Sequence, residues 1–179
     1  MDTAAAIGAW LGAAVIVLAD GRRGLAVGIG LVALGFAGLA WTEGSWVGTA
    51  FLVVGGAAAV IELLRARPHD WGFMPPGSTA RLILAVVGGI ISLWIAASVT
   101  TGPGAPLRFA SLAVMALMSG RLLQSQSATA VLTAAAGLAI ALAGASAIAP
   151  SGSDYAPYLL GAAIAAGALL LPVSESRGA

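Results

Sequence analysis

Long apolar stretches separated by short polar breaks run through the whole chain. A helix that crosses the hydrocarbon core of a bilayer needs roughly 20 mostly apolar residues, with a range of about 17–25. Seven stretches meet this requirement, and the breaks between them carry glycine, proline and charged residues, which end helices. We therefore predict an all-α, polytopic transmembrane helix bundle that forms a single integral-membrane domain over residues 1–179. The predicted helices cover residues about 3–19, 24–41, 46–64, 82–100, 107–123, 128–149 and 155–173.

The composition agrees with a lipid environment. Hydrophobic residues make up 60% of the chain and charged residues 8%, with a mean hydropathy of +1.01, whereas a soluble domain is about 25% charged. A water-soluble fold of this size could not bury that much apolar surface, so the lipid bilayer is the first expected partner. The net charge of +1 gives no reason to expect nucleic acid as a partner.

The chain contains no cysteine and a single histidine. The lack of cysteine excludes disulfides, thiolate chemistry, Fe–S clusters and zinc sites built on cysteine. One histidine excludes a bis-histidine haem or a three-histidine metal site within one chain. We therefore predict no catalytic residue, no metal and no cofactor, and an enzymatic role is the weaker interpretation.

The arginines are distributed unevenly between the two sides of the predicted bundle. With seven spans and the N-terminus outside, seven of the eight arginines lie on the cytoplasmic side and only Arg108 lies outside. This distribution follows the positive-inside rule, so we predict an outside N-terminus and a cytoplasmic C-terminus. All the basic residues are arginine, and alanine and glycine are abundant. Such a composition indicates a high-GC prokaryote, and the predicted location is the prokaryotic cytoplasmic (inner) membrane, as a multi-pass protein.

The longest polar interruption is a predicted cytoplasmic loop at residues 65–81. Arginines pair with anionic headgroups or phosphate, and tryptophan prefers the membrane interface, so we expect this loop to lie on the membrane surface. The histidine and aspartate have no recognisable nucleophile or metal beside them, which disfavours catalysis. The residues predicted to contact lipid or a partner protein are Arg65, Arg67, His69, Asp70, Trp71 and Arg81.

Ionisable residues are nearly absent from the predicted spans. Glu62 is the nearest, and Arg65 follows it at i+3 on the same helix face, so the main interpretation is a local ion pair. The alternative is a carboxylate at the mouth of a cavity. Trp94 lies near the middle of its helix, where it could face a cavity. Glu62 and Trp94 are therefore the candidates for a pocket or a pairing. Arg108 and Arg121, near opposite ends of the fifth helix, are expected to extend to the two interfaces.

Small residues recur at four-residue spacing, which lets helix backbones approach closely. The main interpretation is packing inside the bundle, and the alternative is a docking face for another subunit. Two pairs of adjacent glycines, Gly55–Gly56 and Gly88–Gly89, predict a kink or a close helix crossing, with an unwound substrate site as the alternative. The spaced pairs are Gly8 and Gly12, Gly24 and Gly28, Gly137 and Ala141, and Gly161 and Ala165.

Three functions agree with this pattern. The first is an integral membrane subunit of a larger membrane protein complex, with a structural or assembly role and no chemistry of its own. Its partners are other membrane subunits or further copies of the chain. The second is a small-molecule transporter or substrate-binding membrane component, with an apolar pocket near the paired glycines and Trp94. The third is a lipid-modifying enzyme at the cytoplasmic interface, which would use Glu62, His69, Asp70 and the arginines.

Overall fold

The computed structural model describes residues 1–65, 71, 79–99, 101–102, 104–125, 127–148 and 155–171, although not every side chain within 79–99. This part of the chain is helical, with short connections and no strand, which confirms the predicted all-α class. The helices are α1 (Asp2–Leu18), α2 (Arg22–Thr42), α3 (Trp46–Arg65), α4 (Thr79–Val99), α5 (Ala105–Gln124), α6 (Ala128–Ala147) and α7 (Ala156–Leu170).

Among the described residues, α2, α3, α5 and α6 are each long and apolar enough to cross a membrane. The chain is therefore a helical membrane protein. The shorter helices α1 and α7 have 17 and 15 residues. At 1.5 Å per residue they are about 26 Å and about 22 Å long, against a hydrocarbon core of about 30 Å. Crossing by α1, α4 and α7, which the seven-span prediction requires, stays a prediction.

Helices α2, α3 and α4 extend beyond the predicted apolar stretches into polar residues. The segment 65–81 was predicted as a loop, but Arg65 is the last residue of α3, and α4 already begins at Thr79, so Arg81 lies in its first turn. In the same way α2 begins at Arg22. Hydropathy marks the part of a helix that lies in hydrocarbon. Backbone hydrogen bonding continues past it, where long polar side chains reach water.

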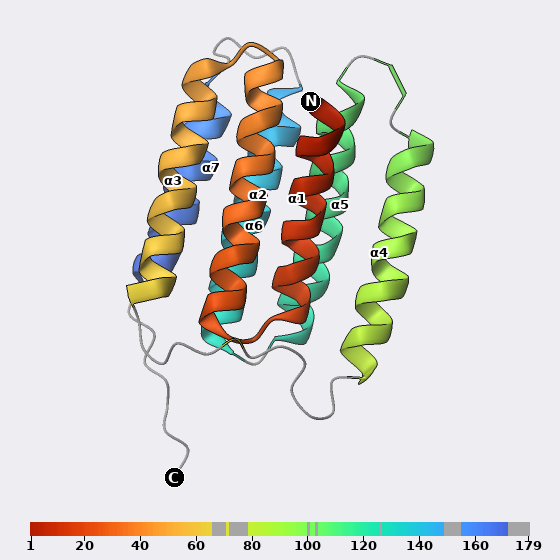
Figure 1. Cartoon of the computed structure of the whole chain (residues 1–179), viewed down its shortest axis with the longest axis vertical. Helices are drawn as coiled ribbons and strands as arrows, with labels where there is room; N and C mark the ends of the chain where they lie inside the picture. The colour runs from red at the N-terminus through yellow and green to blue at the C-terminus, as the bar shows by residue number, and fades with distance from the viewer. Residues whose placement is uncertain are drawn as a thin grey trace.

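Six of the helices form two layers, and α4 stands apart at one edge (Figure 1). The layer α1–α2–α3 faces the layer α5–α6–α7, with α1 against α5, α2 against α6 and α3 against α7. Consecutive helices run in alternating directions, so facing helices of the two layers run the same way. The main contacts of α4 are with α5 and α1. The core is therefore a six-helix body, and α4 is attached to one side of it.

The closest packing in the bundle is between α1 and α2. A methyl group at Gly12 would lie 2.7 Å from the Gly28 carbonyl oxygen and 2.7 Å from the Val32 nitrogen. One at Gly28 would lie 2.9 Å from the Gly12 carbonyl oxygen. The two backbones touch at these glycines, which confirms internal packing as the role of Gly12 and Gly28, one member of each of two predicted pairs. A methyl group at Gly8, by contrast, would meet no atom within 4 Å.

The two pairs of adjacent glycines have different surroundings. In α3, Gly55 lies against Ala162 of α7 and Gly56 lies against Ala33 of α2, so this pair marks a close crossing of three helices. In α4, a methyl group at either glycine of Gly88–Gly89 would meet nothing within 4 Å. The predicted close crossing is therefore confirmed for the pair in α3. In α4 an added methyl group would meet no atom, so this pair forms no such crossing within the described residues, and a kink there stays a prediction.

We predict that Gly12→Ala destabilises the bundle, because the added methyl group meets the backbone of α2 and a backbone cannot rotate away. Overpacking of this kind costs about 1–3 kcal/mol. Thermal unfolding in mild detergent should show a lower midpoint for this variant. The matched control is Gly8→Ala, on the same helix, which fills open space and should leave the midpoint unchanged or raise it, since alanine favours helix. Equal midpoints for the two variants would contradict the close contact.

Candidate functional site

Charged side chains gather at one end of the bundle, which we call the charged end. Here α1, α3 and α5 end and α2 begins (Figure 1). Its arginines are Arg22, Arg23, Arg65 and Arg121, and its acids are Asp20 and Glu62. Arg108 belongs to the first turn of α5, at the opposite end. The charged end holds two separate arrangements, a buried ion pair and a cavity.

The buried ion pair joins α5 to the turn between α1 and α2. Arg121 is in the last turn of α5 and is only 2% exposed. Its Nη2 donates a hydrogen bond to the Ala19 carbonyl oxygen at 2.7 Å and another to the Asp20 Oδ1. The Ala19 carbonyl lies at the C-terminal end of α1, where carbonyl groups lack intrahelical partners and the helix dipole favours a positive charge. One arginine thus caps α1 and pairs with Asp20.

The prediction that Arg121 extends to the membrane interface was wrong. The side chain points into the bundle, because the end of α1 and the Asp20 carboxylate offer it partners there. Its Nε and Nη1 are buried without a hydrogen-bond partner in the described structure. Sequence reasoning also missed Asp20. The sequence did contain a signal for this pair. Asp20 lies in the turn between two apolar helices, and the alternating directions of the helices bring Arg121 to the same end of the bundle.

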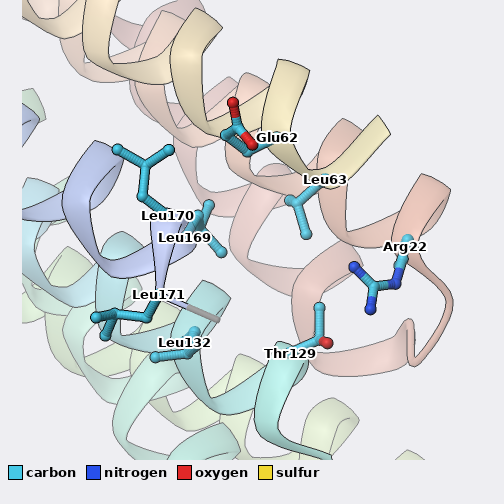
Figure 2. A pocket seen from close by; sticks show the side chains of 8 residues that line it. All are labelled: Arg22, Glu62, Leu63, Thr129, Leu132, Leu169, Leu170 and Leu171. Atoms are coloured by element: carbon cyan, nitrogen blue, oxygen red, sulfur yellow. The ribbon is translucent and has the colours of Figure 1, made fainter. Parts of the chain in front are cut away.

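The cavity lies between α2, α3, α6 and the end of α7 and has a volume of about 260 Å³. In Figure 2 the Arg22 guanidinium points into it from the start of α2, and the Glu62 carboxylate lies on its α3 side. Leucines from α7 and α6 cover much of the remaining wall. The cavity therefore combines one cationic and one anionic group with an apolar lining. The lining residues are Arg22, Glu62, Leu63, Thr129, Leu132, Leu169, Leu170 and Leu171.

Both interpretations of Glu62 meet at this cavity. Its Oε1 accepts a hydrogen bond from Arg65 Nη1 at 3.0 Å, which is the predicted i+3 ion pair. The same carboxylate lines the cavity. The Arg65 side chain is 72% exposed and that of Glu62 is 27% exposed. An ion pair with an exposed partner contributes little stability, typically about 0–1 kcal/mol, and a carboxylate has room for further donors.

A second hollow, the apolar groove, lies between α1, α4 and α5 and has a volume of about 300 Å³. Trp10 lines it from α1, and its Nε1 is buried without a hydrogen-bond partner in the described structure. Gly89 lines the groove from α4. Trp94, a predicted pocket residue, is 71% exposed and is not part of the lining of either hollow. The groove is lined by Trp10, Ala14, Leu18, Leu82, Val86, Gly89, Ile90, Leu93 and Leu117.

Most of the residues predicted to contact lipid or a partner fall outside the described residues. These are Arg67, His69, Asp70 and the side chain of Arg81. Trp71 is described and is 51% exposed. The surface role of segment 65–81 therefore stays a prediction. Among the described residues, no three His, Asp or Glu side chains lie together in a way that could hold a metal ion.

The fold and the charged end define a helical membrane protein with a buried ion pair and a polar cavity at one end of its bundle. The chain matches no protein-family model, no curated protein and no solved structure at a significant level.

We predict that Arg121→Ala destabilises the protein strongly. The truncation removes the cap of α1 and leaves the Asp20 carboxylate without this partner, and breaking a buried pair costs about 3–5 kcal/mol. The thermal unfolding midpoint in detergent should fall by about 10 °C. Arg108→Ala is the matched control on the same helix, because Arg108 makes one long hydrogen bond of 3.5 Å to the Thr101 carbonyl oxygen. Similar midpoints for the two variants would contradict the role given to the Arg121 pair.

Proposed function

We propose that the chain is an integral membrane subunit of a larger membrane complex, with a structural role, and that α4 is the helix that carries the partner. The observation that supports this proposal is the exposure of α4. Ile83, Ile90 and Trp94 are 56%, 61% and 71% exposed, and Gly89 is the one buried residue among those of α4 whose burial is described. The other helices each bury a face against a neighbour.

The glycines of α4 support a protein helix as the occupant of this surface. Helices associate in lipid by close packing at small residues, because lipid tails are as apolar as the side chains. In α3, Gly55 packs against α7 and Gly56 packs against α2 of the same chain. In α4, Gly88–Gly89 has no atom within methyl contact, although the sequence feature is the same. Gly88 is only partly buried, and it leaves room for the close approach of an apolar transmembrane helix of another subunit.

A second candidate function is a substrate-binding membrane component, and the apolar groove behind α4 supports it. Among the described residues, no ionisable side chain lines the groove, so its ligand would be an apolar molecule. A ligand in the groove would cover only the side of α4 that faces α1 and α5. A partner subunit would also cover the side that faces away from the bundle, so the subunit role explains more of the exposed surface of α4.

We further propose that all seven helices cross a prokaryotic cytoplasmic membrane, with the N-terminus outside and the charged end in the cytoplasm. The alternating directions of the helices (Figure 1) and the gathering of arginines at one end support this arrangement through the positive-inside rule. The short helices α1 and α7 pack beside longer ones. Flanking polar residues and local thinning of the bilayer accommodate such a mismatch at modest cost.

Site-specific photo-cross-linking tests the subunit role. A photoreactive residue at Trp94 should form a discrete adduct with another membrane polypeptide when the chain is expressed in its own membrane. The matched control is Leu160 of α7, which is 60% exposed and should give no discrete protein adduct. An adduct of the chain with itself would show that the partner is a second copy of the chain and not a different subunit. Adducts with lipid alone at both positions would contradict the proposal, and a small apolar adduct at Trp10 would favour the second candidate.

Cysteine labelling tests the orientation, since the chain contains no cysteine of its own. In intact cells, a membrane-impermeant maleimide should label Glu43→Cys, in the exposed turn between α2 and α3. It should label Arg23→Cys only after the membrane is permeabilised, because Arg23 is exposed at the charged end. The reverse pattern would place the charged end outside.

A further inference from the structure

We propose that the cavity at the charged end binds a zwitterionic ligand that carries an oxyanion and a protonated amine, the chemistry of a phosphoethanolamine headgroup. This inference goes beyond the subunit role and does not depend on it. It is carried by the placement of Arg22 and Glu62 in one cavity of about 260 Å³ with leucines around them. Figure 2 shows the arrangement.

The oxyanion would lie at Arg22. The guanidinium points into the cavity from the first turn of α2 (Figure 2), and its fork of N–H donors matches the oxygens of a phosphate. Five donors are available on one guanidinium, so a contact within the protein leaves others for a ligand. The N-terminal end of α2 adds positive potential at the same place.

The amine would lie at Glu62. Its carboxylate lines the cavity while Oε1 accepts one hydrogen bond from Arg65. Arg65 approaches along the same helix at i+3 and is mostly exposed to solvent. Such a pair is weak, and the remaining acceptor positions of the carboxylate can take an ammonium group. Thr129, which is 7% exposed, adds a polar side chain to the wall formed by α6.

The two opposite charges select the class of ligand. A purely anionic group would enter beside the Glu62 carboxylate, and a purely cationic group would enter beside the Arg22 guanidinium. Like charges placed together cost binding free energy. A zwitterion satisfies both residues at once, and this difference is the basis of the expected selectivity.

The position of the cavity suits a lipid headgroup. It lies at the ends of α2, α3 and α6, which are helices long and apolar enough to cross a membrane. The ends of such helices lie at the depth of the headgroups. Leu169, Leu170 and Leu171 offer an apolar wall to the glycerol and the first methylenes of a lipid. A free water-soluble zwitterion has the same polar chemistry, and the experiment below separates the two sources.

Native mass spectrometry of the purified full chain with defined lipids tests the proposal. Phosphatidylethanolamine should be retained at least about tenfold more strongly than phosphatidylglycerol, which lacks the amine, as expected for one charge-assisted contact. N-acetylation of the phosphatidylethanolamine amine should remove this preference. Both comparisons use the unaltered protein, so they are independent of any effect of mutation on folding. Equal retention of the three lipids would overturn the proposal.

Variants then assign the two contacts. Arg22→Ala and Glu62→Gln should each weaken phosphatidylethanolamine binding by about tenfold. Glu62→Gln should strengthen phosphatidylglycerol binding, because it removes the like charge that disfavours an anionic lipid. Arg23→Ala is the matched control, because it removes the same charge from the adjacent, exposed position outside the cavity lining. Binding by Arg22→Ala and Glu62→Gln that equals binding by Arg23→Ala would overturn the assignment of the site.

Competition identifies the source of the ligand. Glycerophosphoethanolamine, which has the headgroup and no acyl chains, is added to the chain loaded with phosphatidylethanolamine. Displacement of the lipid at millimolar concentrations of this competitor would support a site that recognises the headgroup alone and also binds a soluble zwitterion. Retention of the lipid, together with the selectivity above, would support a lipid site in which the leucines contribute.

Discussion

The close contact between the backbones of α1 and α2 is the constraint on which the rest of the bundle depends. In lipid no hydrophobic force draws helices together, so contact must come from dispersion between surfaces that fit. Gly12 and Gly28 provide such surfaces at the centre of one layer, and Gly55–Gly56 extends the contact to α3 and α7. Because a side chain at these positions would overlap the neighbouring helix, the glycines set how closely α1, α2, α3 and α7 approach one another.

Polar anchoring complements this packing at the charged end. The last turn of α1 has carbonyl groups without partners, and lipid cannot satisfy them. Arg121 reaches across from the other layer and donates a hydrogen bond to one of them, that of Ala19, with Asp20 balancing its charge. The same arginine therefore caps the end of α1 and links the two layers. A pair of this kind specifies one arrangement of the helices more than it adds net stability.

Hydropathy and helix-ending residues predicted the positions of the helices well, because both are local properties of the sequence. What each side chain faces depends on neighbours that are distant in sequence. Arg121 looked like an interfacial residue, and its burial follows from a partner about 100 positions away. Glu62 was predicted correctly as a partner of Arg65, because that pair lies within one helix turn. Gly88–Gly89 resembles Gly55–Gly56 in sequence. Only the three-dimensional arrangement shows that an added methyl group would meet a neighbouring helix at the second pair and no atom within 4 Å at the first.

The cavity and the apolar groove are built by different helices, and this separates the functions that they support. The cavity is built by α2, α3, α6 and the end of α7, whereas the apolar groove is built by α1, α4 and α5. A partner helix seated on α4 would leave the cavity open to lipid on the far side of the bundle. Contacts still connect the two. Leu117 of the groove lies one turn before Arg121, and Arg121 holds Asp20, two residues before Arg22 of the cavity. The hydrogen bonds of Arg121 thus tie the turn that precedes the cavity's cation to α5, the helix that supports α4.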